Sequence, residues 1–202
     1  MKLGLRYTNF NKLYNVFEPR ISTNYQFLRD QFLNFSFQNL YQFLHQAAIS
    51  SQNTPIDFYL PSNQSLKPQE SQQISLGYGV IYDLFTVEID AYFKNIQNYI
   101  EFRNGSLHNL FSNDIYGDIS VGTLTSYGAE FSMKYQKKQL KANLSYTYSK
   151  SKAQFDELND GLQFPVVFDR PHNFNILLNY QVNKRLTLGT LFLLTRIKLL
   201  AL

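Results

Sequence analysis

The stretch Glu70–Lys94, ESQQISLGYGVIYDLFTVEIDAYFK, decides the predicted fold. Apolar and polar residues alternate along both of its halves, on either side of Asp83. A period of two places one apolar and one polar face on a β-strand. Two such strands joined by a very short turn predict a hairpin. Each strand is about twice the usual length of roughly 5–6 residues, so we expect a sheet of long strands.

The apolar face of this hairpin is compatible with two architectures. In a soluble β-sandwich it packs into a core between two sheets, whereas in a transmembrane β-barrel it contacts lipid and the polar face lines a wet lumen. Short turns fall near residues 29, 83, 137 and 184, and long polar loops fall near residues 57, 112 and 160. Because the two kinds alternate, we expect all short turns at one rim and all long loops at the other. Bacterial outer-membrane barrels are built in this way, so the barrel is favoured.

The remaining strands are predicted from the same alternation. The predicted strands are Leu3–Thr8, Phe17–Phe27, Leu33–Tyr41, the central hairpin with its second strand continuing to Phe102, Thr123–Tyr135, Leu140–Tyr148, Phe174–Val182 and Leu186–Phe192. The segment from Leu44 to Gln69 is expected to be irregular. Pro19 lies within a strand and indicates a strand end or a locally unpaired N–H.

About nine long strands predict an all-β fold, namely a fragment of an antiparallel up-and-down transmembrane β-barrel. Single-chain bacterial barrels have even strand numbers, and for this reason we expect a fragment. Residues 1–195 are assigned to the partial barrel. Residues 196–202 are expected to be an aberrant or truncated tail, because the alternation ends there.

Composition limits the class of protein. The net charge of +4 and the 17% of charged residues are too modest to indicate a nucleic-acid partner. No run of about 18 apolar residues predicts a transmembrane helix, and the absence of cysteine excludes a disulfide framework. No signal peptide opens the chain, so we expect the N-terminus of an exported protein to be missing.

No catalytic pattern stands out, and we predict neither an enzyme nor a cofactor. The sequence has no Gly-x-Ser-x-Gly motif and no phosphate loop. His45 and His108 fall in or near the long loops and are candidate ligand-binding residues, although we predict no metal site. Phe58 and Tyr59 in the first long loop are candidates for stacking on a sugar or siderophore.

Charged residues of the predicted polar face are expected to pair with one another or to face a domain inside the lumen. They are Glu18, Arg20, Glu88, Asp90, Glu130 and Lys134. The segment Asp169-Arg170-Pro171-His172 is expected to have a structural role at the start of a strand. There Arg170 could pair bidentately with Glu130 or Glu88.

Several motifs follow one another along most of the chain. They are NVFEPRIS from Asn15, DFYLPS from Asp57 with LKPQES from Leu66, AYFKNIQNYIE from Ala91, SYGAE from Ser126 and FDRPHNFN from Phe168. Their order and spacing resemble the barrel of TonB-dependent outer-membrane receptors, especially the Bacteroidetes type. The resemblance runs from about Gly4 to Leu194.

The resemblance implies a barrel of about 22 strands with a plugged lumen. It also implies TonB-energised import of a scarce siderophore, metal chelate or oligosaccharide across the outer membrane of a Gram-negative bacterium. The implied partners are outer-membrane lipid, a plug domain, TonB and a surface lipoprotein. The plug domain and the TonB-binding region are expected to be missing from this chain. A passive porin-like or adhesin-like barrel and a non-functional pseudogene fragment stay open as alternatives.

Overall fold

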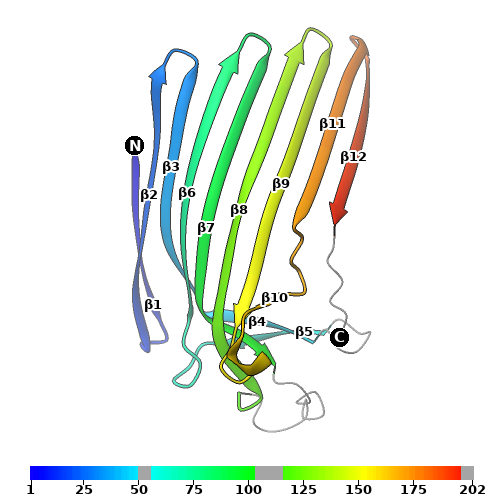
Figure 1. Cartoon of the computed structure of the whole chain (residues 1–202). Helices are drawn as coiled ribbons and strands as arrows, with labels where there is room; N and C mark the ends of the chain where they lie inside the picture. The colour runs from blue at the N-terminus through cyan, green and yellow to red at the C-terminus, as the bar shows by residue number, and fades with distance from the viewer. Residues whose placement is uncertain (50–55, 103–115, 197–202) are drawn as a thin grey trace.

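The computed structural model describes residues 1–49, 56–102 and 116–196, and nearly all of them lie in β-strands (Figure 1). The strands are β1 (Lys2–Phe10), β2 (Tyr14–Leu28), β3 (Gln31–Gln42), β4 (Leu44–Ile49), β5 (Ile56–Pro61), β6 (Gln69–Tyr82), β7 (Phe85–Phe102), β8 (Ile119–Lys137), β9 (Leu140–Gln154), β10 (Phe164–Pro165), β11 (His172–Asn183) and β12 (Leu186–Arg196). In the described ranges, no helix has the length and apolar character needed to cross a membrane.

The strands form one large antiparallel sheet in the order β1-β2-β3-β6-β7-β8-β9-β11-β12, with β10 paired to β9. Strands that follow one another in the sequence are neighbours in this sheet, with two exceptions. β4 and β5 form a separate two-stranded sheet between β3 and β6, and β10 pairs only with β9, so that β11 follows β9 in the large sheet. This order confirms the predicted up-and-down wall. It also confirms the central hairpin, whose second strand ends at Phe102.

The strand register places the apolar residues in continuous rows on one face of the sheet. One such row runs through Leu33, Tyr78, Ile89, Phe131, Tyr146, Phe174 and Leu194. The side chains on this face are exposed, for example Leu5 by 70%, Leu76 by 59% and Ile89 by 51%. A sandwich would bury these rows under a second sheet, so their exposure fits the wall of a transmembrane barrel.

The connections divide between the two ends of the sheet as predicted (Figure 1). The tight turns β2–β3, β6–β7, β8–β9 and β11–β12 lie at one end, and the β4–β5 hairpin and the β9–β11 connection lie at the other. We call the second end the long-loop rim. The division is less strict than expected, because the β1–β2 connection at this rim has only three residues, Asn11–Leu13. β1 and β2 are longer than predicted, and they extend into the stretch between the predicted strands Leu3–Thr8 and Phe17–Phe27.

The prediction that Leu44–Gln69 is irregular was wrong for Leu44–Ile49 and Ile56–Pro61, where β4 and β5 pair from Leu44↔Pro61 to Ile49↔Ile56. Figure 1 shows this hairpin lying across the long-loop rim rather than continuing the barrel strands. A small apolar core of Leu60, Leu66, Ile100 and Ile119 joins it to the rim. The Pro and Ser residues of the segment predicted loop, but burial of these apolar side chains stabilises a local hairpin.

Candidate functional site

The face opposite the apolar rows carries a ladder of polar side chains. Cross-strand hydrogen bonds join Ser36 to Ser75 (2.7 Å) and Ser126 to Ser151 (2.8 Å). Glu88 forms an ion pair with Lys134, with 3.7 Å between Oε1 and Nζ. Asp90 lies in register between Gly77 and Glu130. A polar and charged lining of this kind suits the water-filled interior of a large barrel.

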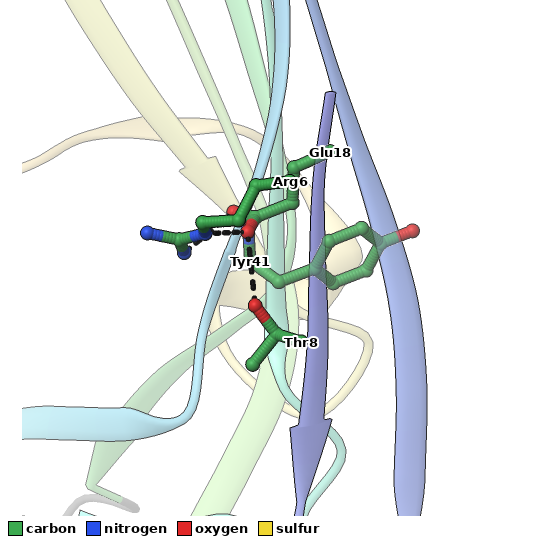
Figure 2. Close-up of polar contacts among 4 residues, drawn as sticks. All are labelled: Arg6, Thr8, Glu18 and Tyr41. Atoms are coloured by element: carbon green, nitrogen blue, oxygen red, sulfur yellow. Dashed lines mark hydrogen bonds and ion pairs between the residues drawn. The ribbon is translucent and has the colours of Figure 1, made fainter. Parts of the chain in front are cut away.

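Glu18 is the most constrained charged residue on this face (Figure 2). Its carboxylate has no exposed surface and accepts hydrogen bonds from both Nε and Nη2 of Arg6, the latter at 2.8 Å. The hydroxyl of Thr8 (3.3 Å) and the backbone N–H of Tyr41 (3.0 Å) also donate to it. The four donors come from β1 and β3 and the carboxylate from β2, so this carboxylate ties the three strands together at the long-loop rim.

The sequence explains why the carboxylate is needed at this point. β2 pairs with β3 only from Arg20 onward, and the preceding residue, Pro19, has no N–H with which to extend the ladder. β3 therefore parts from β2, and the N–H of Tyr41 needs another acceptor. Glu18 supplies it. The expectation of an interrupted ladder at Pro19 is confirmed, although β2 itself continues through the proline because β1 pairs with it on the other side.

A cavity of about 290 Å³ opens on the polar face beside Glu18. Its lining includes three basic side chains, Arg6, Arg20 and Lys94, and the single carboxylate of Glu18. Arg6 forms an ion pair with Glu18, so Arg20 and Lys94 give the cavity an excess of positive charge. Guanidinium and ammonium groups bind carboxylate, phosphate or chelate oxygens, so the cavity is suited to an anionic group.

The predicted ligand-binding residues do not converge. His45 is completely buried, with Nε2 3.0 Å from the hydroxyl of Ser62 and with Nδ1 lacking a hydrogen-bond partner. Burial lowers the pKa of His45 from its ordinary value of 6.5, and a backbone interaction with Lys67 opposes this in part. Tyr59 is exposed by 59% on β5 at the long-loop rim. Phe58 lies on the same strand, but its side chain is outside the described part, as is the whole of His108.

The segment from Asp169 to His172 leads into β11, and its hydrogen bonds are made to other partners than the predicted carboxylates. Asp169 is buried, and its Oδ1 accepts a hydrogen bond from the backbone N–H of Ser151 (2.9 Å). The predicted pairing of Arg170 with Glu130 or Glu88 was wrong. In the strand register, Glu130 lies opposite Thr147, and Thr147 lies opposite Asn173. Arg170 precedes Asn173 in the chain and lies nearer the rim than the row that contains Glu130. Glu88 is on β7, one strand farther from Arg170 than Glu130.

His172 lies on the apolar face of the sheet. It pairs in register with Tyr148 on β9 and with Arg196 on β12. Its Nδ1 is 2.8 Å from the hydroxyl of Tyr146, and the Tyr148 ring centroid is 5.5 Å from that of the imidazole. His172 is therefore part of an aromatic cluster at the long-loop rim.

Two functional features were missed at the level of sequence. The partners of Glu18, namely Arg6, Thr8 and Tyr41, could be found only from the register, because the length of the β1–β2 turn fixes which residues face each other. The basic lining of the cavity was missed for the same reason, since Arg20 and Lys94 are far apart in the sequence and belong to one row through Gln38 and Gln73. Among the residues that the structure describes, no group of three or more His, Cys, Asp or Glu side chains could hold a metal ion.

Comparison with known proteins gives one family and one fold. The family model described as "TonB dependent receptor-like, beta-barrel" matches residues 2–197. A search of curated proteins finds no match. Among solved structures, the chain is similar to the ferric-catecholate import receptor Fiu from E. coli K12 (15% identity, TM-score 0.57, covering 87% of this chain and 24% of that one).

Two further solved structures show the same fold. They are the FrpB iron transporter from Neisseria meningitidis (12% identity, TM-score 0.57, covering 87% of this chain and 26% of that one) and the alcaligin outer-membrane receptor FauA from Bordetella pertussis (19% identity, TM-score 0.54, covering 89% and 29%). The chain thus spans about a quarter of the length of these receptors. From its apolar outer rows, its polar inner ladder and the family match over nearly its whole length, this chain belongs to the TonB-dependent receptor β-barrel family.

Proposed function

We propose that this chain is a section of the wall of an outer-membrane receptor that binds a scarce ligand and imports it by TonB-energised transport, without covalent chemistry. The observation that carries the proposal is the two-faced sheet. Its exposed apolar rows fit lipid, and its hydrogen-bonded polar face opens into a basic cavity near the long-loop rim. We also propose that the protein resides in the outer membrane of a Gram-negative bacterium.

Of the three ligand classes considered, a siderophore or another metal chelate is better supported than an oligosaccharide. The excess positive charge from Arg20 and Lys94 favours an anionic ligand. The solved structures of similar fold include one named as a ferric-catecholate import receptor and one named as an iron transporter. Tyr59, and Phe58 beside it on β5, are proposed to stack on the ligand at the rim.

The partners belong to the same proposal. A plug domain would contact the polar face, TonB would act on the plug, outer-membrane lipid would cover the apolar face, and a surface lipoprotein would act at the long-loop rim. The motifs from Asn15 to Asn175 support a Bacteroidetes-type receptor.

The test is uptake of radiolabelled ferric siderophores by the producing bacterium, with and without this gene and with and without a protonophore. We expect saturable uptake that needs both the gene and the energised inner membrane. The double variant R20Q/K94Q should weaken uptake of anionic chelates by about tenfold, since each charge-assisted contact contributes about 1 kcal/mol or more. The matched control R29Q/K141Q removes the same two charges near the short turns and should have no effect.

The passive alternative predicts a different result. A porin-like barrel would pass its solutes in the presence of the protonophore and without saturation. If uptake of every chelate tested is independent of the gene, the import proposal fails.

A further inference from the structure

Along the part of the long-loop rim that the structure describes, basic residues gather on the apolar face at one place only. The row Phe37, Ile74, Phe93 and Tyr127 ends at Lys150 on β9. The next row toward the rim, Asn39, Gln72, Asn95 and Thr125, ends at Lys152. The row on the other side of Lys150 runs through Tyr148 and His172 to Arg196 on β12. We call Lys150, Lys152 and Arg196 the basic rim patch.

The position of the patch is unusual for charged residues. Over β3 to β8 the corresponding positions are filled by apolar side chains or by the neutral Asn39, Gln72, Asn95 and Thr125. A Lys or Arg facing lipid destabilises a barrel to a degree that depends on its depth, so these residues need an anionic partner or water. Within the described residues, none of the three patch side chains forms an ion pair with a carboxylate. The patch therefore presents uncompensated positive charge where the apolar band ends.

The neighbours of the patch are those of a membrane interface. Tyr146 and Tyr148 surround His172 directly beside it, and tyrosines are enriched at the level of lipid headgroups because one end of the ring is apolar and the other polar. The connection from β10 to β11 adds two exposed apolar side chains, Val167 (68%) and Phe168 (56%). Lys150 and Lys152 are only half-exposed, as expected when an apolar stem packs on the sheet and the ammonium group reaches toward headgroups.

We propose that the basic rim patch binds the phosphate groups of lipopolysaccharide in the outer leaflet. The long loops of outer-membrane barrels face the outside, so the patch lies at the headgroup level of that leaflet, whose anionic lipid is a phosphorylated glycolipid. Lys and Arg both bind phosphate oxygens, and clusters of them beside an apolar surface are typical of anionic-lipid sites. The inference depends on the proposed outer-membrane location but not on the ligand or on TonB.

The experiment uses the full chain in zwitterionic micelles, with bisphosphorylated lipid A as the probe and binding measured by calorimetry. The variant K150Q/K152Q/R196Q should bind about 100-fold more weakly than the unchanged chain, at about a factor of five for each basic residue near the headgroups. The control K137Q/K184Q/R185Q removes two Lys and one Arg at the short turns. It should bind within about twofold of the unchanged chain. Circular dichroism should show the same strand content for all three proteins.

Three results would overturn the proposal. The control variant could lose as much affinity as the patch variant, which would mean non-specific attraction of charge. Phosphatidylglycerol or inorganic phosphate could bind as tightly as lipid A, or the removal of both lipid A phosphates could leave affinity unchanged. The siderophore-uptake assay stays separate, because a loss of uptake with lipid A binding intact would remove only the import proposal.

Discussion

At the scale of single residues, the environment of Glu18 shows how one carboxylate compensates for one proline. Pro19 stops the β2–β3 ladder, and the N–H of Tyr41 is satisfied by the Glu18 side chain instead. A buried carboxylate with four donors stabilises the strands only while all of its partners are present, because a buried charge without partners is costly. The pairing of Glu18 with Pro19 in the sequence is thus explained by the hydrogen bonding of the backbone.

The substitution Glu18→Gln tests this explanation. The amide cannot accept hydrogen bonds at both of its terminal atoms, so at least one of the donors from Arg6, Thr8 and Tyr41 loses its acceptor. We expect a loss of about 1–3 kcal/mol in the free energy of unfolding, measured by urea titration of the chain in lipid vesicles.

The matched control for that substitution is Glu88→Gln on the same face. Glu88 is partly exposed and has an ion pair of 3.7 Å with the exposed Lys134, so the expected change is only about 0–1 kcal/mol. Equal losses in the two variants would contradict a special role for Glu18.

His45 predicts a pH dependence of the β4–β5 hairpin. Because burial lowers its pKa, the folded hairpin binds fewer protons than the unfolded one at mildly acidic pH. The contribution of neutral His45 is fully present above the unfolded pKa of 6.5 and is lost as the pH falls through the lower folded value. The protection factors of the β4 and β5 amides against hydrogen exchange should therefore fall as the pH is lowered from about 8 to about 5.

The variant His45→Gln removes the titrating group and keeps a donor for Ser62. Its hairpin amides should exchange with much the same protection factors across the same range. If the unchanged chain and the variant show the same pH dependence, His45 is not the cause.

At the scale of elements, a glycine on the polar face leaves room for a large side chain from the neighbouring strand. A Cβ added at Gly128 would lie 2.4 Å from the backbone oxygen of Tyr148 and 2.9 Å from the Tyr92 ring. The Tyr92 ring thus covers the backbone of a residue that has no side chain. This arrangement stabilises a sheet at the position of a glycine. This gives a physical reason for the glycine in the Ser126–Glu130 motif.

The substitution Gly128→Ala should therefore destabilise the sheet, with an expected cost of about 1–3 kcal/mol from overpacking against backbone. Gly4→Ala is the control, because the nearest atom to its Cβ would be the Cβ of Arg20 at 3.7 Å, an ordinary contact. The measurement is the urea midpoint of each variant in vesicles. A Gly128→Ala midpoint no lower than that of Gly4→Ala would show that the Tyr92 ring and the β9 backbone adjust freely.

At the scale of the whole molecule, the exposed apolar rows and the polar ladder define which side meets lipid. Ile89 lies in the middle of the apolar rows, with Tyr78 on one side and Phe131 on the other. Thr147 lies on the polar face, opposite Glu130. The two positions are matched in strand context and differ in the face that they occupy.

The pair Ile89→Arg and Thr147→Arg tests the orientation. Arginine at position 89 should cost about 2–4 kcal/mol in a bilayer, because the charge would lie near the midplane of the lipid. Arginine at position 147 should cost little, since it faces water and Glu130. The measurement is the free energy of unfolding from lipid vesicles, and a larger cost at position 147 would reverse the assignment of the two faces.

Periodicity alone predicted the class of fold, the positions of the nine long strands of the large sheet, its four tight turns and most of the division of the connections between the rims. This was possible because the side chains of a strand alternate between two faces. Whether a face contacts an apolar or an aqueous environment determines whether its residues are apolar or polar. The Glu18 cluster, the basic cavity, the buried His45 and the basic rim patch were decided only by the tertiary structure. Each depends on the register between strands that are distant in sequence, and an alternating pattern leaves open which residues lie opposite one another.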